Sequence, residues 1–374
     1  MRIGQVTYSY QPVMGGGDVY AAMLFRLLAE QGHQQWVYQR RTAAEDPALR
    51  FVPNPLARFH RGEFWTQALF LSRLKADLLQ EELLIAHYPV YLLAAARLRK
   101  GGRPALLGIS HGVTWDERPG SVSARIKRAV ARRAFRLADS FIANDTFFLR
   151  EMGLAAPPRQ GLFAEVAPAR WFIPNCVPPD LCAGRPREEL RALRPVLVPR
   201  NLYRNRGIHL AVEAFQYFAP EHPETHLLIV GEESQPAYVQ EVKQRVKELR
   251  LEERVIFRGH VPHDEMADFY ASSELCLVPS ICGEGTSLSA LEAMAGGVAV
   301  ISTDVAGLKD LPTVQCAPEA RALAQAMLQV YPQRRRIGAE QQAQVAQDYS
   351  YERWSQSWRE AILQVGKNLH QERL

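Results

Sequence analysis

The fold is decided by the stretch Gly-Glu-Gly-Thr-Ser-Leu-Ser-Ala-Leu-Glu-Ala-Met-Ala-Gly-Gly, residues Gly283–Gly297. An apolar run at Glu274–Ser280 precedes it and a second, Val298–Ile301, follows it, and both predict strands. Between them, small residues lead into leucine and methionine at helical spacing, and a glycine pair ends that helix. Strand, glycine turn, helix and strand predict a βαβ unit, in which ligands bind at the carboxyl end of the first strand. The helix start adds free N–H groups and a positive dipole end, which suit an anion.

Two carboxylates frame this turn, Glu284 before the helix and Glu292 within it, with seven residues between them. Along a helix axis this spacing corresponds to about 12 Å. That distance is too large for paired acid–base chemistry on one bond, and it suits one ligand that spans the helix start. The alternative is structural: Glu284 is a charge favoured by the helix dipole, and Glu292 is a solvated surface residue.

The sequence Glu-Gly-Thr-Ser-Leu, continued by Leu-Glu-Ala-Met-Ala-x-Gly, resembles the Glu-x7-Glu signature of the retaining, family-4 nucleotide-sugar glycosyltransferases with the GT-B fold. The resemblance implies that Glu292 holds the ribose of the nucleotide and that Glu284 lies by the donor sugar. It also implies that backbone N–H groups of the turn face the sugar and the diphosphate. These turn residues are Gly285, Thr286, Ser287 and Leu288.

Two features of the first half match the same family. A glycine triplet that includes Gly16 and Gly17 lies between a strand and the helical pattern Val19–Glu30, which is a phosphate-binding arrangement. It corresponds to the Gly-Gly loop that the family places beside the donor diphosphate. His111 ends another strand, in Gly-Ile-Ser-His-Gly, where the family often has a histidine near the sugar; the alternative is a structural loop histidine. His87 ends a neighbouring strand, and we expect it to line the cleft.

Two arginines precede a predicted helix in the second half, Arg200 after a strand and Arg206 before Gly207. The family has an arginine and a lysine in these places as cationic partners of the diphosphate. Arginine at position 206 keeps the charge and binds phosphate with two parallel hydrogen bonds. Solvent-facing arginines are the alternative. Further along, the strand that ends at Gly259 and Val261 corresponds to the family's nucleobase site.

The domain organisation follows from the alternation of strands and helices in both halves. With 374 residues and 47% apolar content, the chain has room for two domains, and a proline-rich segment, 155–199, marks their junction. We expect an α/β protein with two Rossmann-like, doubly wound domains that face each other across a cleft. The first domain spans residues 1–180 and also includes the last helix, about 351–374. The second domain spans 190–350. Segment 304–318 is shorter than the family's usual Gly-Gly-x-x-Glu loop.

The cysteines form an odd set without Cys-x-x-Cys spacing, which argues against a disulfide framework and a zinc site and favours a reducing cytoplasm. No stretch has the apolar length of a transmembrane helix, and the chain begins with a strand pattern rather than a signal peptide. We therefore expect a cytoplasmic protein without a metal site. The cysteines are Cys176, Cys182, Cys276, Cys282 and Cys316.

Charge is unevenly distributed: residues 1–194 carry a formal charge of +10 and the remainder carries −5. The basic half is expected to face something anionic, although no nucleic-acid motif is present. A helical pattern over Val122–Ala138 places several arginines on one face without an acidic residue among them. Such a helix suits peripheral contact with the anionic inner face of a membrane or a phosphorylated acceptor; a solvated face is the alternative. Its arginines are Arg125, Arg128, Arg132 and Arg136.

The resemblance implies a retaining glycosyltransferase that moves a sugar from a nucleoside diphosphate, most often UDP, to a hydroxyl of a sugar or lipid-linked acceptor. Envelope or capsule polysaccharide is the expected product, and no cofactor is expected. Charge stabilisation would come from Arg200 and Arg206, with Glu284 and His111 beside the sugar. No general base is evident, in keeping with a mechanism in which the leaving phosphate takes the acceptor proton.

Three alternatives remain open. A phosphorylase on this fold often binds pyridoxal phosphate, whose lysine we do not find, and an oxidoreductase requires a Gly-x-Gly-x-x-Gly motif that is absent. A non-catalytic sugar-nucleotide-binding partner protein would keep the fold without turnover.

Overall fold

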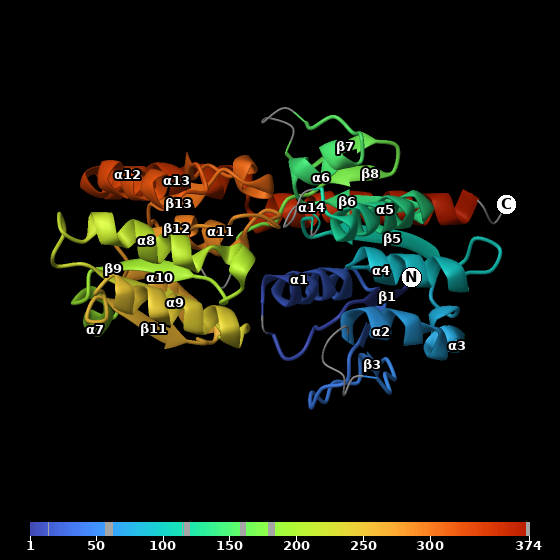
Figure 1. Ribbon diagram of the computed structural model, residues 1–374. Coiled ribbons are helices and arrows are strands. Elements are labelled where there is room, and N and C mark those ends of the chain that lie inside the picture. Colours follow the sequence, from blue (N-terminus) through green and yellow to red (C-terminus); the bar gives the residue numbers. More distant parts are fainter. Residues whose placement is uncertain are drawn as a thin grey trace. The chain divides into compact units, whose positions relative to one another are not determined.

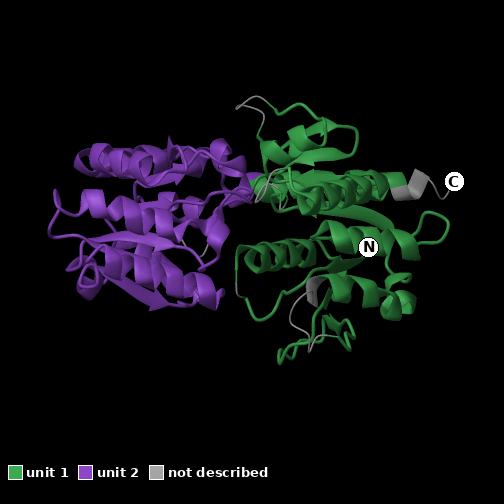
Figure 2. Cartoon of the chain, in the orientation of Figure 1, with its two compact units in different colours: residues 1–174, 354–374 green, residues 175–353 purple. Residues whose placement is uncertain are grey.

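The computed structural model describes residues 1–13, 15–56, 63–113, 115, 120–157, 162–178 and 184–371 (Figure 1). The chain forms two compact units (Figure 2). Unit 1 consists of Met1–Pro174 together with Trp354–Leu374, and unit 2 of Asn175–Arg353. Each unit is a parallel sheet with helices, and the last helix belongs to the first unit, so the expected fold class is confirmed. Cys182 lies outside the described residues.

Unit 1 is built on an eight-stranded sheet in the order β3-β2-β1-β4-β5-β6-β8-β7, parallel except for the β7–β8 pair. Its central strands are buried on both faces, which explains why they read as continuous apolar runs. The chain order reverses between β1 and β4, and ligands of open α/β sheets bind at such a point. The strands are β1 (Arg2–Val6), β2 (Gln34–Gln39), β3 (Leu49–Phe51), β4 (Leu83–Ala86), β5 (Ala105–Ser110), β6 (Ser140–Ala143), β7 (Ala164–Ala167) and β8 (Arg170–Phe172).

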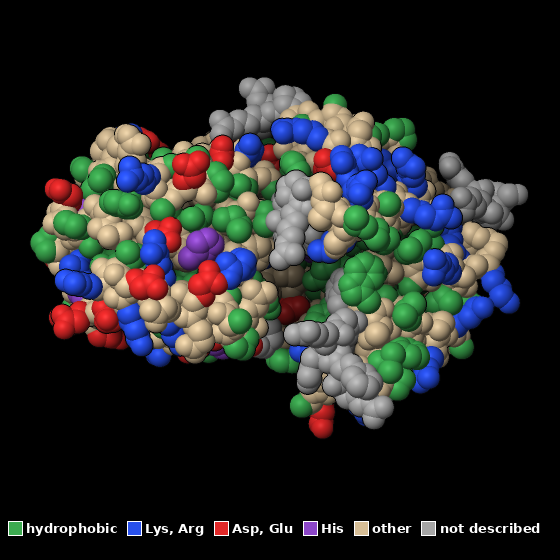
Figure 3. Space-filling view, in the orientation of Figure 1, with side chains coloured by type: hydrophobic (Ala, Val, Ile, Leu, Met, Phe, Trp, Pro, Cys, Tyr) green, Lys and Arg blue, Asp and Glu red, His purple; other side chains and the backbone are tan. Residues whose placement is uncertain are grey.

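The helices of unit 1 include the basic one that the arginine pattern predicted, α5, over which Lys and Arg side chains gather in Figure 3. A 3₁₀ turn, Leu71–Leu74, separates two short helices, Glu63–Phe70 and Lys75–Leu78. Described helices are α1 (Gly16–Glu30), α2 (Glu63–Phe70), α3 (Lys75–Leu78), α4 (Pro89–Leu98), α5 (Val122–Leu137), α6 (Thr146–Glu151) and α14 (Tyr351–Gln371).

The sequence suggested that the proline-rich segment 155–199 is a junction between domains, but it also contains part of the sheet of unit 1. Strands β7 and β8 lie within it and extend the sheet of unit 1 beyond β6. With four and three residues, these strands are too short to show an alternating pattern.

The last helix, α14, packs on α1 through aromatic side chains. Trp354 and Trp358 are fully buried, and their rings meet the ring of Tyr20 edge-on. The indole of Trp358 donates a hydrogen bond of 3.1 Å to the Tyr20 hydroxyl. Burial of each such side chain contributes roughly 2–3 kcal/mol, which accounts for the return of this helix to the first unit.

Unit 2 contains a six-stranded, fully parallel sheet in the order β11-β10-β9-β12-β13-β14. Its chain order reverses between β9 and β12, which defines a second ligand-binding position by the same rule. The strands are β9 (Pro195–Pro199), β10 (His226–Val230), β11 (Val255–Gly259), β12 (Leu275–Val278), β13 (Val300–Thr303) and β14 (Val314–Cys316).

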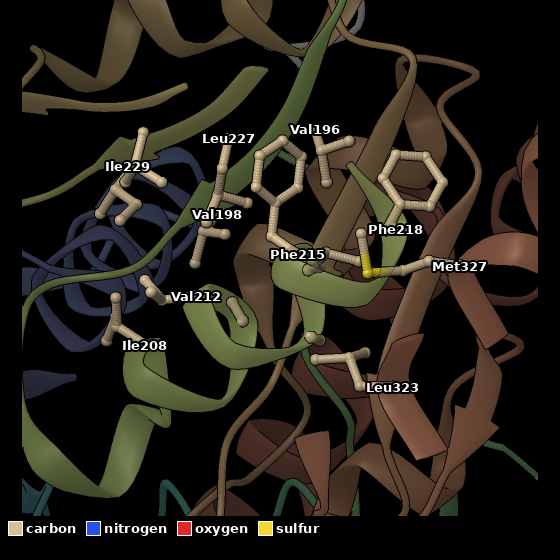
Figure 4. Packing of buried hydrophobic residues seen from close by; sticks show 14 of the residues in the cluster. Val196, Val198, Ile208, Val212, Phe215, Phe218, Leu227, Ile229, Leu323 and Met327 are labelled. Atoms are coloured by element: carbon tan, nitrogen blue, oxygen red, sulfur yellow. The ribbon is translucent and has the colours of Figure 1, made fainter. Parts of the chain in front are cut away.

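The core of unit 2 is an aliphatic and aromatic layer between the sheet and its helices (Figure 4). Phe215 and Phe218 of α8 are fully buried, together with Val196 of β9 and Met327 of α12. Truncation of one such phenylalanine to alanine costs about 3–5 kcal/mol, so this layer fixes the sheet that carries the site. The helices are α7 (Glu188–Arg191), α8 (Ile208–Phe218), α9 (Pro236–Glu248), α10 (Met266–Ala271), α11 (Leu288–Ala295), α12 (Ala320–Val330) and α13 (Arg334–Asp348).

Candidate active site

The reversal point of the unit 2 sheet carries a cluster of charged side chains. Arg200 directly follows β9, and Glu284 lies in the turn after β12, the neighbouring strand. Because the carboxyl ends of parallel strands meet at one edge of a sheet, the two residues converge despite their separation in sequence. The guanidinium of Arg200 donates to the carboxylate of Glu284, and Arg206 forms an ion pair with the same oxygen.

Three serines complete the environment of Arg200. Its Nη1 donates to the hydroxyls of Ser287 at 3.2 Å and Ser289 at 3.0 Å. Its Nη2, which also donates to Glu284, donates to the hydroxyl of Ser280 at 3.1 Å. The hydroxyl of Ser280 in turn donates to Glu284 at 2.8 Å. These contacts hold the guanidinium plane at the start of α11.

The cluster is an electropositive site. Burial lowers the pKa of Arg200 to about 10, which leaves the guanidinium charged at neutral pH. Two guanidinium groups, Arg200 and Arg206, face the one buried carboxylate of Glu284, so these three groups together carry a net positive charge. Arginine pairs of this kind, beside a helix N-terminus, are suited to a diphosphate.

Gly207 explains why an arginine–glycine pair is needed before α8. Its φ of +68° lies in the left-handed region. A Cβ at this position would lie 1.9 Å from the carbonyl oxygen of Pro279, at the end of β12. Only glycine permits this approach of the loop, which brings Arg206 to Glu284.

The structure holds the turn before α11 from two sides. The backbone N–H of Gly307 donates to the carbonyl of Glu284 at 3.0 Å, which gives the shortened segment 304–318 a supporting position. The side-chain amide of Asn175 donates to the carbonyl of Thr286. Ser287 is the residue before α11, and Leu288 is its first residue. Because the helix begins at Leu288, Glu284 lies outside it, and the spacing of about 12 Å along a helix axis does not apply.

Glu292 is not a solvated surface residue, as one interpretation of the sequence had it. Its side chain is 4% exposed, and both of its oxygens have partners. His263 shares a hydrogen bond of 2.9 Å with one oxygen, and the Tyr270 hydroxyl donates to the other at 2.8 Å. Burial lowers the pKa of His263, but the hydrogen bond and charge of Glu292 outweigh it, so the pKa is raised overall. Each oxygen of the carboxylate is thus held by one hydrogen bond.

The sequence interpretation missed His263 and Tyr270. The only signal was their place in and beside the short helix that precedes β12, which faces α11 in a βαβ unit. Of the residues proposed for the nucleobase, Gly259 has φ of +77° and Val261 is buried.

In unit 1, the proposed residues lie at the reversal point of the other sheet or one strand beyond it. Gly16 and Gly17 open α1, which follows β1, and a Cβ on Gly17 would come within 3.2 Å of the Tyr88 hydroxyl. His111 follows β5, and its Nε2 lies 3.1 Å from Nδ1 of His87.

His87 and His111 are uncharged at neutral pH. Burial lowers the pKa of His111 to about 4, and it lowers the pKa of His87 well below its usual range, with the neighbouring His111 adding to the effect. His87 does not line a cleft: it is 1% exposed. His111 is half-buried, and its ring meets that of Tyr20 edge-on at 4.9 Å.

Comparison with known protein families gives two matches that lie in the two units. Residues 14–156 match the model described as Glycosyltransferase Family 4, and residues 194–333 match Glycosyl transferases group 1. The chain belongs to the family-4 type of glycosyltransferases. The enzyme is 26% identical over 332 residues to mannosylfructose-phosphate synthase of Agrobacterium fabrum, a match that covers 79% of this chain and 72% of that protein.

Solved structures confirm the GT-B fold of this glycosyltransferase. Sucrose-phosphate synthase from Thermosynechococcus elongatus superposes with a TM-score of 0.81 at 21% identity, over 98% of this chain and 99% of that one. Anabaena Alr3699/HepE, in complex with UDP and glucose, superposes with a TM-score of 0.77 at 18% identity, over 97% of this chain and 99% of that one.

Proposed function

We propose that this glycosyltransferase uses a nucleoside-diphosphate sugar, with UDP as the nucleotide, and transfers the sugar to an acceptor hydroxyl with retention of anomeric configuration. The carrying observation is the pair of guanidinium groups, Arg200 and Arg206, on the single carboxylate of Glu284 at the reversal point of the unit 2 sheet. A diphosphate can accept charge-assisted hydrogen bonds from both guanidinium groups. The bound UDP of Anabaena Alr3699/HepE, which shares the fold, supports the same donor class.

Each charged residue has one task in this proposal. Arg200 and Arg206 stabilise the charge that develops on the leaving diphosphate. Glu284 then exchanges part of its contact with the arginines for the donor sugar. Glu292, held by His263 and Tyr270, accepts hydrogen bonds from the ribose hydroxyls. The nucleotide sugar is a substrate, and the proposal requires no cofactor.

Retention is consistent with the groups around the cluster. The carboxylate of Glu284 is occupied by two arginines and is poorly suited to act as a base. The leaving phosphate would take the proton of the acceptor hydroxyl on the same face of the sugar. A polysaccharide or other glycoconjugate is the proposed acceptor, in keeping with the match to a lipopolysaccharide core mannosyltransferase of Rhizobium meliloti, 34% identical over 110 residues.

The donor is tested by thermal shift against UDP-, GDP-, ADP- and dTDP-sugars, with NAD and pyridoxal phosphate as controls. A ligand at one hundred times its Kd adds about 2.7 kcal/mol to the free energy of unfolding. One UDP-sugar is expected to raise Tm, and Glu292→Ala should abolish that rise. A response to a control alone contradicts the proposal. Transfer without hydrolysis, and the anomeric coupling of the product by NMR, separate a retaining transferase from a silent binding protein.

A second part of the proposal concerns α5, which presents a cationic face of unit 1 (Figure 3). Arg125, Arg133 and Arg136 are exposed, and none of them has an ion pair in the described part of the chain. They line a hollow of about 480 Å³. Arg128 differs, because it forms a salt bridge of 2.7 Å with Glu151.

Aliphatic side chains accompany these arginines on the outer face of the helix. Val122 is 63% exposed and Ile126 57%. Arginines beside exposed aliphatic residues fit an anionic lipid surface better than a free phosphate, which offers nothing apolar to bury. We therefore propose peripheral contact of α5 with an anionic, cytoplasmic membrane face. None of the described helices is long and apolar enough to cross a membrane.

Flotation with vesicles tests this contact. The protein should bind phosphatidylglycerol vesicles, and this binding should weaken as the salt concentration rises. It should not bind phosphatidylcholine vesicles. Replacement of Arg125, Arg133 and Arg136 by glutamine should weaken binding roughly hundredfold, at about 1 kcal/mol per arginine. The matched control replaces Lys247, Arg258 and Arg335, which are exposed on unit 2. Equal losses in both triple variants contradict a role specific to α5.

A further inference from the structure

Four polar side chains form a continuous line across the sheet of unit 1. Gln35 lies on β2, Gln5 on β1, His87 directly after β4 and His111 directly after β5. These four strands are consecutive neighbours in the sheet. The side chains share one face, because Gln5 is in register with Val37 and Ile85, and Ile85 with Leu107. Side chains two residues apart on a strand point to the same side.

Hydrogen bonds join every pair of neighbours in this line. Gln5 Nε2 lies 3.4 Å from Gln35 Oε1, and Gln5 Oε1 lies 3.0 Å from His87 Nε2. His87 Nδ1 then lies 3.1 Å from His111 Nε2. Gln5 and His87 are at most 1% exposed, so water cannot replace these partners.

The direction of the hydrogen bonds is set at the outer end, by a main-chain carbonyl. Gln35 Nε2 donates to the carbonyl of Phe25 in α1 at 2.8 Å, and a carbonyl can only accept. The amide oxygen of Gln35 therefore faces Gln5, and Gln5 must donate to it. The amide oxygen of Gln5 is then left for His87, which must donate from Nε2.

The same logic carries through the two imidazoles. A neutral imidazole has one N–H and one lone pair. Since His87 carries its hydrogen on Nε2, its Nδ1 accepts, and His111 must donate from Nε2. The remaining nitrogen of His111, Nδ1, is therefore an acceptor, and no described side chain or backbone group binds it.

We propose that this hydrogen-bond relay fixes the tautomer of His111, so that its Nδ1 accepts a hydrogen from a sugar hydroxyl. Gln35, Gln5 and His87 are its positioning residues. An acceptor nitrogen binds a hydroxyl and does not bind a phosphate oxygen, so the relay assigns His111 to the sugar and not to the diphosphate. This consequence rests on the proposed glycosyl transfer; the tautomer itself does not.

The tautomer is tested without any substrate. Long-range ¹H–¹⁵N correlation spectra of histidine-labelled protein at neutral pH distinguish protonated from unprotonated ring nitrogens. Both His87 and His111 are expected to carry hydrogen on Nε2 only. A hydrogen on Nδ1 of His111 in the unmodified protein overturns the relay, whatever the enzymatic activity.

A reversed relay gives the sharper test. In Gln5→Glu, the new carboxylate beside His87 favours its doubly protonated form. His87 would then donate from Nδ1 to His111 Nε2, and the hydrogen of His111 would move to Nδ1. Gln67→Leu is the control, because Gln67 is a buried glutamine of the same unit that donates to the Thr7 carbonyl outside the relay. It should leave the spectrum of His111 unchanged, and a change of tautomer there, or none in Gln5→Glu, counts against the relay.

Titration identifies the hydroxyl. Addition of UDP-glucose should shift the Nδ1 resonance of His111 if the hydroxyl belongs to the donor sugar. A shift only after addition of an acceptor glycan assigns it to the acceptor. UDP alone should have no effect, and a shift with UDP alone contradicts the assignment to a sugar. With an active donor, Gln5→Glu should lower kcat/KM about tenfold, the equivalent of one lost hydrogen bond.

Discussion

The two units place polar residues at the same topological position and use opposite chemistry there. In unit 2 the reversal point holds full charges, with Arg200 and Arg206 on Glu284. In unit 1 the reversal point and the strand next to it hold neutral groups, His87 and His111, whose pKa values burial lowers. Full charges stabilise a leaving diphosphate, whereas neutral acceptors recognise hydroxyl groups without competing for it. The proposed site residues therefore fall into an ionic half, on unit 2, and a neutral half, on unit 1.

The largest effect is expected from the ionic half. Arg200→Ala should lower kcat/KM about 100- to 1,000-fold, because it removes a donor aimed at the developing charge. Steady-state kinetics with the UDP-sugar that binds best provides the measurement.

Arg204 is the matched control for this variant. It lies four residues away, is exposed and pairs with Glu241 at the surface. Arg204→Ala should change kcat/KM less than twofold. If the two variants lose activity equally, the cluster has no special role.

Glu292→Gln is expected to act on nucleotide binding and less on the chemical step. The amide keeps the volume but loses a charged acceptor, which is worth about 1.5–3 kcal/mol. The Kd for UDP should rise about 10- to 100-fold in isothermal titration calorimetry. Glu340→Gln, an exposed glutamate of α13, should leave the Kd unchanged. An unaltered Kd in Glu292→Gln would refute the ribose contact.

The pH dependence of stability should differ in sign between the units. The pKa of His111 is about 4 in the folded protein and about 6.5 in the unfolded chain, so its stabilisation is present above pH 6.5 and is lost as pH falls toward 4. The raised pKa of His263 has the reverse effect: its stabilisation is present below pH 6.5 and is lost as pH rises through the folded value. Each proton contributes at most about 1.4 kcal/mol per pH unit.

Urea midpoints between pH 4.5 and 8.5 measure both contributions. His111→Gln should flatten the acidic side of the profile, and His263→Gln the side above pH 6.5. The comparison between units fails if both variants change the same side.

The smallest effect is expected from the scaffold of the neutral half. Trp358→Phe removes the hydrogen bond to Tyr20 while most of the apolar contact stays. The free energy of unfolding should fall by about 1 kcal/mol, with little change in the Kd for UDP. Chemical denaturation of the variant tests this, and a large loss of nucleotide affinity would show that α14 does more than support unit 1.

The sequence by itself determined the turn that carries Glu284 in the ionic half, whereas the contact of Glu284 with Arg200 depends on the pairing of β9 with β12. Glycines, small turn residues and acidic side chains at fixed spacing appear in one local stretch, Gly283–Gly297, because a strand–turn–helix unit builds its anion site from neighbouring residues. The alternation of strands and helices likewise fixed the fold class. Aromatic spacing in the last helix placed Trp354 and Trp358 on one face, which the structure buries.

Tertiary structure alone decided the rest. Glu292 has two partners, His263 and Tyr270, which come from a short 3₁₀ turn and from α10. Neither sequence carries a spacing signal toward α11. The line from Gln35 to His111 exists only because β2, β1, β4 and β5 are neighbours and in register. Strand order is a long-range property: each pairing joins segments separated by tens of residues, and local periodicity contains no information on which strands pair. The sequence therefore specified which residues carry charge, and the sheet decided which neutral residues lie beside one another.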